Sequence, residues 1–155
     1  MAQSLAQIYL HLIFSTKDRQ RLLTPEIQPE LFDYIGGTLN GLECPVARVG
    51  GMEDHVHVLF SLSKNHAPKY VVGEVKRKSS IWIKRRWPEM RGFQWQGGYG
   101  IFSVSATRVQ NVKRYIERQA DHHKIKTFRE EFIEFLQEYD IDYDERYLWD
   151  AEHGL

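Results

Sequence analysis

The order of strand-like and helix-like segments is the feature that most limits the folds open to this chain. Residues 5–15 alternate as a strand does, since Leu10, Leu12 and Phe14 share one face while His11 and Ile13 take the other. In chain order the expected segments are a strand over 5–15, a helix over 24–41, strands over 45–50 and 54–62, a helix over 67–87, an interrupted strand over 93–104, and helices over 105–123 and 127–139.

This β-α-β-β-α-β order followed by two helices predicts an α+β protein with a ferredoxin-like antiparallel sheet and helices on one face. The length of 155 residues fits a single domain over residues 1–155. Apolar residues make up 42% and charged residues 27%, which is typical of a soluble globular protein. There is no secretory leader pattern and only one cysteine, Cys44, so a cytoplasmic location is expected.

Charge is unevenly distributed along a chain whose formal net charge is zero. The segment 69–91 has eight basic and two acidic residues, whereas 128–150 has nine acidic and two basic residues. The basic segment could contact a phosphate backbone, or it could simply be the solvated face of a helix. The acidic segment has no role that its composition alone reveals.

Two histidines separated by one residue, His55 and His57, lie in the expected strand over 54–62. Alternate strand residues point to the same face, so both imidazoles could hold one cation. The alternative is a pair of packed, hydrogen-bonded core histidines. Asp54 is expected to point to the opposite face and therefore to add little to such a site.

Tyr115 and Gln119 lie four residues apart in the expected helix over 105–123, and so share one face of it. On a helical wheel this is a polar side, while Val112, Ile116 and Ala120 fall on the side expected to face the core. The Gln119 amide oxygen suits a hard cation, and neutral nitrogen and oxygen ligands favour Mg²⁺ or Mn²⁺, with zinc as an alternative. The Tyr115 hydroxyl is then a candidate nucleophile for metal-assisted attack on a phosphodiester.

Taken together, these residues resemble the single-tyrosine HUH transposases of bacterial insertion sequences (the IS200/IS605-like family), including relatives associated with palindromic repeats. The resemblance extends to the segment from His11 to Lys17, to that from Trp95 to Val104, and to the helix from Tyr115 to His123. It implies a ferredoxin-like fold with a C-terminal nucleophile helix. By motif matching, His55, His57 and Gln119 would hold Mg²⁺ or Mn²⁺, and Tyr115 would attack.

The resemblance also implies the substrate and the assembly. The substrate would be single-stranded DNA beside terminal hairpins, cleaved and rejoined through a 5′-phosphotyrosine intermediate without a nucleotide cofactor. The protein would form a homodimer in which the tyrosine helix can complete the partner's site. Residues that could bind this DNA are basic side chains and aromatic rings from the middle of the chain: Lys76, Arg77, Lys84, Arg85, Trp95 and Tyr99.

Two other functions remain open on the residues alone. One is a non-catalytic or domesticated nucleic-acid-binding module on the same fold, which the basic segment and the aromatic residues would also suit. The other is a small metalloprotein unrelated to DNA, which would need only the histidine pair.

Overall fold

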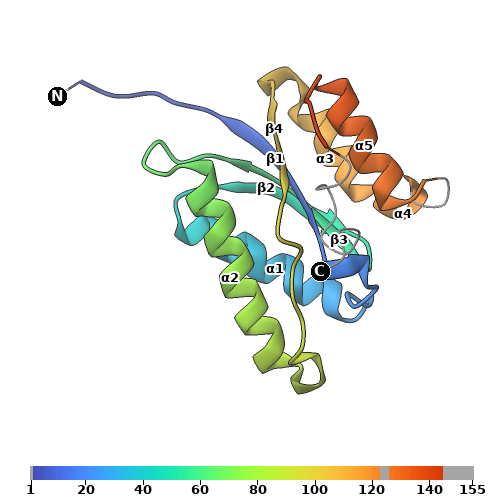
Figure 1. Cartoon of the computed structure of the whole chain (residues 1–155). Coiled ribbons are helices and arrows are strands. Elements are labelled where there is room, and N and C mark those ends of the chain that lie inside the picture. The colour runs from blue at the N-terminus through green and yellow to red at the C-terminus, as the bar shows by residue number, and fades with distance from the viewer. Residues whose placement is uncertain (1, 123–125, 145–155) are drawn as a thin grey trace.

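A four-stranded antiparallel sheet with strand order β2-β3-β1-β4 forms the centre of the molecule, with helices against both of its faces (Figure 1). The computed structural model describes residues 2–122 and 126–144. The elements are β1 (Tyr9–Ser15), η1 (Lys17–Arg19), α1 (Ile27–Gly41), β2 (Val46–Gly51), β3 (His55–Ser61), α2 (Pro68–Arg86), η2 (Pro88–Met90), β4 (Gly100–Val104), η3 (Ala106–Arg108), α3 (Val109–Glu117), α4 (Gln119–His122) and α5 (Phe128–Glu138). The predicted ferredoxin-like order is confirmed.

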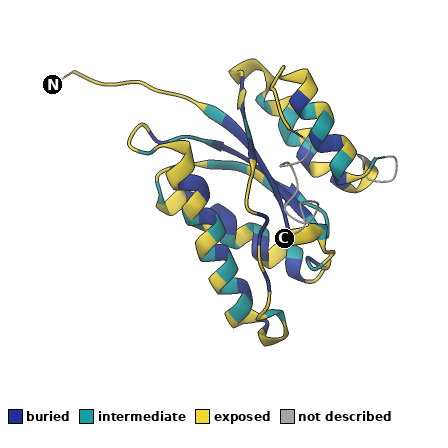
Figure 2. Cartoon of the chain, viewed as in Figure 1, coloured by how far each residue is buried: buried dark blue, intermediate teal, exposed yellow. Residues whose placement is uncertain are grey.

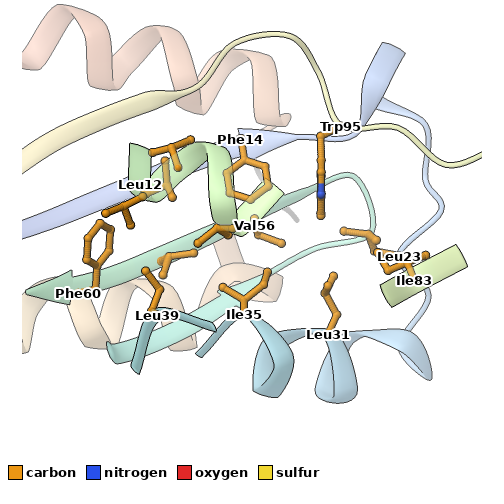
Figure 3. Packing of buried hydrophobic residues seen from close by; sticks show 14 of the residues in the cluster. Leu12, Phe14, Leu23, Leu31, Ile35, Leu39, Val56, Phe60, Ile83 and Trp95 are labelled. Carbon is orange, nitrogen blue, oxygen red and sulfur yellow. The ribbon is translucent and has the colours of Figure 1, made fainter. Parts of the chain in front are cut away.

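The larger core lies between one face of the sheet and the helices α1 and α2. Leu12 and Phe14 of β1 and Val56 of β3 point to this side, where they meet the apolar face of α1 (Figure 3). That face is formed by Leu31 and Ile35, one turn apart and both fully buried. The alternation predicted for the first strand is therefore confirmed.

The opposite face of the sheet is covered by α3 and α5, and it is largely buried as well (Figures 1 and 2). Ile13 of β1 packs there with Phe132 of α5, and Leu59 of β3 packs with Ile116 of α3. The alternation of β3 places both histidines on this second face. The site therefore lies between the sheet and the two C-terminal helices.

Several boundaries differ from those predicted from the sequence. The first strand begins at Tyr9 rather than at Leu5, because Tyr9 is the first residue with partners in both neighbouring strands. In the region over 93–104, Trp95 forms only an isolated bridge to Thr16, and the paired strand begins at Gly100. The helix expected over 105–123 is divided at Arg118, whose φ of −102° and ψ of 24° are not helical.

The ends of two helices lie close to the predicted ranges and have local causes in the sequence. The helix α2 begins at Pro68 and ends one residue before Trp87, which precedes Pro88. The helix α5 begins with a capping box, in which the Thr127 hydroxyl accepts from the Glu130 amide and the Glu130 side chain accepts from the Thr127 amide. Among the helices of the described ranges, none has both the length and the apolar character needed to span a bilayer.

Candidate metal and nucleophile site

His55 and His57 lie side by side on β3, and both side chains are completely buried. Their ring centroids are 5.1 Å apart. His55 Nδ1 is 2.7 Å from Asp54 Oδ1, and His57 Nδ1 is 2.8 Å from His11 Nε2. Both Nε2 atoms face the same interior space, in which other side chains meet them.

Asp54 contributes to the site, and the expectation that it points away from His55 is wrong. The reason is its backbone position, since Asp54 lies in a bend before β3 begins and the strand alternation does not apply to it. A carboxylate that accepts a hydrogen bond from one imidazole nitrogen fixes the tautomer and leaves a lone pair on the other nitrogen. With Nδ1–H donated to Asp54, His55 presents the lone pair of Nε2 to the site.

His11 has the corresponding position beside His57. Burial, together with the neighbouring His57, lowers the pKa of His11 well below its ordinary value. His11 is therefore neutral at pH 7, and its Nε2 can accept the Nδ1–H of His57. In that arrangement His57 also presents the lone pair of Nε2 to the site. His11 was not singled out from the sequence, although its position on the second face of the first strand was correctly predicted.

The structure brings Gln119 and Tyr115 to the same place. Gln119 is 2% exposed, and its Oε1 lies 2.9 Å from His55 Nε2. Tyr115 is half-buried, and its ring centroid is 5.7 Å from that of His57. The side of the helix that looked polar on the wheel thus faces other protein groups, while Ala120, expected in the core, is exposed.

Glu131 of α5 joins these side chains, and the sequence interpretation missed it. Its Oε2 accepts hydrogen bonds from the Tyr115 hydroxyl and, over 3.4 Å, from Gln119 Nε2. Burial and this carboxylate raise the pKa of Tyr115 above its ordinary value. A usable signal was present, because Glu131 falls within the apolar stripe formed by Phe128, Phe132 and Leu136, where a charged residue is unusual.

His55, His57 and Glu131 could hold a metal ion. Each offers one ligand atom, and these atoms lie within 4.8 Å of one another. Imidazole nitrogens with a carboxylate oxygen are a donor set suited to several divalent cations. The residues present therefore fit the metal that the sequence interpretation expected, with Glu131 added to the ligands it named.

A pocket of about 310 Å³ opens beside Tyr115, between α3 and α5. It gives a route from the surface to the tyrosine, since both Tyr115 and Glu131 line it. Its charged lining is mixed: Arg108 and Lys126 are basic, while Glu134 and Glu138 are acidic. The other described lining residues are His11, Asn111, Val112, Phe135 and Tyr139.

The residues predicted to bind DNA have several different environments. Arg77 and Arg85 are exposed on α2, and Arg77 is hydrogen-bonded to Glu74. Lys84, also on α2, is partly buried. Lys76 donates from Nζ to the carbonyl oxygens of Gln96 and Gly98, 2.8 Å and 2.7 Å away. Because α2 packs on the face of the sheet opposite the histidines, this basic surface does not adjoin Tyr115.

The two aromatic residues of that set differ in exposure. Tyr99 is 37% exposed and could stack on a base. Trp95 is only 9% exposed, its indole N–H donates to Ser79 Oγ, and its ring packs edge-on against Phe14 and Phe93. This burial corrects the expectation that Trp95 stacks on DNA, because a ring that is 9% exposed has too little free surface for a base to stack on.

Comparison with known proteins identifies the family to which this chain is similar. Residues 4–119 match the family model described as "Transposase IS200 like". The ISDra2 transposase TnpA of Deinococcus radiodurans is 31% identical over 122 residues, which cover 74% of this chain and 86% of that protein.

Two solved structures share the fold. A putative transposase from Deinococcus radiodurans R1 superposes with a TM-score of 0.63 at 24% identity, covering 77% of this chain and 98% of that one. A REP-associated tyrosine transposase bound to a REP hairpin gives a TM-score of 0.56 at 12% identity, covering 79% and 74%.

Proposed function

Because this chain belongs to the family of IS200-like transposases, we propose that it is a metal-dependent single-stranded DNA transposase that uses Tyr115 as its nucleophile. Cleavage and rejoining beside terminal hairpins would proceed through a 5′-phosphotyrosine intermediate. The observation that carries the proposal is the meeting of the Tyr115 hydroxyl, two imidazoles and Gln119 around one carboxylate.

The residues of the site suit each part of this reaction. Tyr115 Oη would attack phosphorus, the bond from phosphorus to the 3′ oxygen would break, and that oxygen would take a proton from water to leave as a 3′-hydroxyl. The hydrogen bond to Glu131 orients the phenol and gives its proton an acceptor. A divalent cation, Mg²⁺ or Mn²⁺, would polarise the scissile phosphate and offset the charge that develops there.

Single-stranded DNA with hairpins is the proposed partner. One structural relative is described as bound to a REP hairpin. The exposed Arg77 and Arg85 and the partly exposed Tyr99 offer this chain charge and a ring for similar binding. The homodimer remains a prediction, which light scattering would test. Within the single chain, Tyr115 lies beside His57.

The decisive experiment measures a covalent protein–DNA adduct. The full chain is incubated with an end-labelled, hairpin-bearing single strand and Mg²⁺ or Mn²⁺, then separated under denaturing conditions. Wild type and Tyr70→Phe should both form the adduct. Tyr70 is 50% exposed on α2, which packs on the face of the sheet opposite the histidine pair. Tyr115→Phe should form none. Persistence of the adduct in Tyr115→Phe would refute the assignment of the nucleophile.

One observation favours a second candidate, a non-catalytic nucleic-acid-binding module. His55 and His57 have no exposed surface in this structure, because α3 and α5 cover them. Such a module would bind hairpin DNA in a salt-dependent manner. Neither a chelator nor the loss of His55 would change its affinity for DNA, and the module would form no covalent adduct.

A further inference from the structure

Glu131 is a deeply buried acid that lies beyond the residues matched by the family model. The family match ends at residue 119, and α5 begins only at Phe128. Glu131 is nevertheless 2% exposed and lies at the centre of the site. A buried carboxylate is destabilising unless hydrogen-bond donors or a cation replace the lost water, so each of its two oxygens should have such a partner.

The two oxygens of Glu131 have different neighbours. Oε2 accepts from the Tyr115 hydroxyl and from Gln119 Nε2. Oε1 faces the histidines instead, 3.0 Å from His57 Nε2 and 3.6 Å from His55 Nε2. One carboxylate therefore contacts the nucleophile with one oxygen and the imidazole pair with the other.

With one choice of tautomer for the two histidines, the space beside Oε1 is lined by groups that accept rather than donate. When the Nδ1–H groups of His55 and His57 are given to Asp54 and His11, both Nε2 atoms carry lone pairs. Gln119 Oε1, 2.9 Å from His55 Nε2, is a further acceptor. Acceptors this close repel one another unless positive charge lies among them, which a proton or a cation would supply.

The spacing of these atoms fits a six-coordinate cation. Mg²⁺ holds its ligand atoms at about 2.1 Å in octahedral geometry, so neighbouring ligand atoms lie about 3 Å apart. The contacts from His57 to Glu131 and from His55 to Gln119 are 3.0 Å and 2.9 Å. The separation of 3.6 Å between His55 Nε2 and Glu131 Oε1 needs only a small adjustment.

We propose that Glu131 is itself a ligand of the cation held by His55 and His57, and that its second oxygen holds Tyr115 beside that cation. The inference rests on the proposed function, because it takes a divalent cation to be bound there. It adds a carboxylate ligand from α5 to the two histidines and the glutamine that the family resemblance names. It also couples metal binding to the position of the nucleophile, since both depend on one side chain.

Metal affinity without DNA tests the first half of the inference. Binding of Mn²⁺ to the full chain is followed by the electron paramagnetic resonance signal of the free ion, for wild type, Glu131→Gln and Glu131→Ala. Both variants should bind Mn²⁺ at least about tenfold more weakly. The matched control is Glu130→Gln, an exposed residue on the same helix where glutamine also preserves the capping box, and it should bind as wild type does.

The position of Tyr115 tests the second half. The protein is labelled with 3-fluorotyrosine, and the Tyr115 resonance is identified by its absence from Tyr115→Phe. Saturation with Mg²⁺, which is diamagnetic, should shift this resonance in wild type and in Glu130→Gln. In Glu131→Gln, held at saturating Mg²⁺, the shift should be lost or much reduced.

The outcomes separate this inference from the proposed function. If wild type binds Mn²⁺ and Glu131→Gln binds it equally or more tightly, Glu131 is not a ligand, and the transposase proposal stands. Faster adduct formation by Glu131→Gln would likewise overturn the inference and show that the carboxylate obstructs the site. If wild type binds neither cation, metal dependence fails together with the inference.

Melting curves of the metal-free proteins check the fold of each variant. Glu131→Gln replaces a buried acceptor oxygen by a donor, so it should melt no lower than wild type. Added Mn²⁺ should then raise the melting temperature of wild type more than that of Glu131→Gln. Equal increases in the two proteins would count against Glu131 as a ligand.

Discussion

Gly50 of β2 lies directly against Ile116 of α3. A methyl group at Gly50 would be 2.7 Å from Ile116 Cγ2 and 2.9 Å from the Ile116 carbonyl oxygen. Gly50 is paired with His57 across the sheet, and Ile116 follows Tyr115 in the chain. This contact therefore sets the distance between the strand that carries the histidines and the helix that carries the tyrosine.

Gly50→Ala should displace α3 and reduce DNA cleavage. The obstacle includes backbone, which cannot rotate away as a side chain can, so overpacking should cost about 1–3 kcal/mol of unfolding free energy. Adduct formation should fall by at least about tenfold, because a displacement of about 1 Å at a reacting group is costly. Urea unfolding and the adduct assay measure the two effects.

Gly37→Ala is the matched control for that variant. Gly37 lies inside α1, where an added methyl group meets nothing within 4 Å. Alanine should there stabilise the protein by about 0.5–1 kcal/mol and leave cleavage unchanged. If Gly50→Ala were also stabilised and cleaved DNA as wild type does, the position of α3 would not depend on its close contact with β2.

Asp54→Ala should weaken metal binding without unfolding the protein. The carboxylate lies 2.7 Å from His55 Nδ1, and its side chain is only 19% exposed. Loss of such a partner typically costs about 10–100-fold in metal affinity, because the imidazole loses its fixed orientation and tautomer. Mn²⁺ titration should show this loss in Asp54→Ala and not in Asp33→Ala, on the exposed side of α1. Equal affinities would show that Asp54 does not orient His55.

His11 should make the metal-free protein less stable in acid. Its folded-state pKa is lowered by burial, so near pH 6 the unfolded chain binds a proton that the folded chain does not. Stability is therefore present above about pH 6.5 and is lost as the pH falls below that value. Between pH 7.5 and 5.5 the loss from this one group should approach about 1.4 kcal/mol.

His11→Gln should remove that part of the acid dependence. Urea unfolding at the two pH values measures it, with His66→Gln as the control that keeps the wild-type loss, since His66 lies outside the site and contacts Tyr70. An identical acid loss in wild type and His11→Gln would mean that His11 is not held neutral in the folded protein.

Arg85→Ala should reduce the salt dependence of hairpin binding. Arg85 is exposed on α2, and each phosphate contact that is lost lowers the slope of log affinity against log salt by about 0.7–0.9. Fluorescence anisotropy over a range of salt concentrations measures that slope. An unchanged slope would exclude Arg85 from the DNA-binding surface, and Trp95→Phe should leave the slope unchanged because Trp95 is buried.

The order of the elements, and the face of the sheet on which the histidines lie, follow from the sequence alone. Period-two alternation directs His55 and His57 to the same side of β3, and it places His11 on that side of β1. Both results follow from local backbone geometry, which the pattern of side chains reports directly. For the same reason the capping box at Thr127 was predictable, since both of its partners lie within four residues.

The groups that those faces contact depend on how distant elements pack together. Glu131 reaches Tyr115 and His57 because α5 packs through Phe128, Phe132 and Leu136 onto the second face of the sheet, and no local pattern specifies that docking. The position of the basic surface on the far side of the sheet depends in the same way on how α2 packs. Periodicity fixes the direction of a side chain relative to its own backbone, whereas the distance between two elements depends on the packing of residues far apart in the chain.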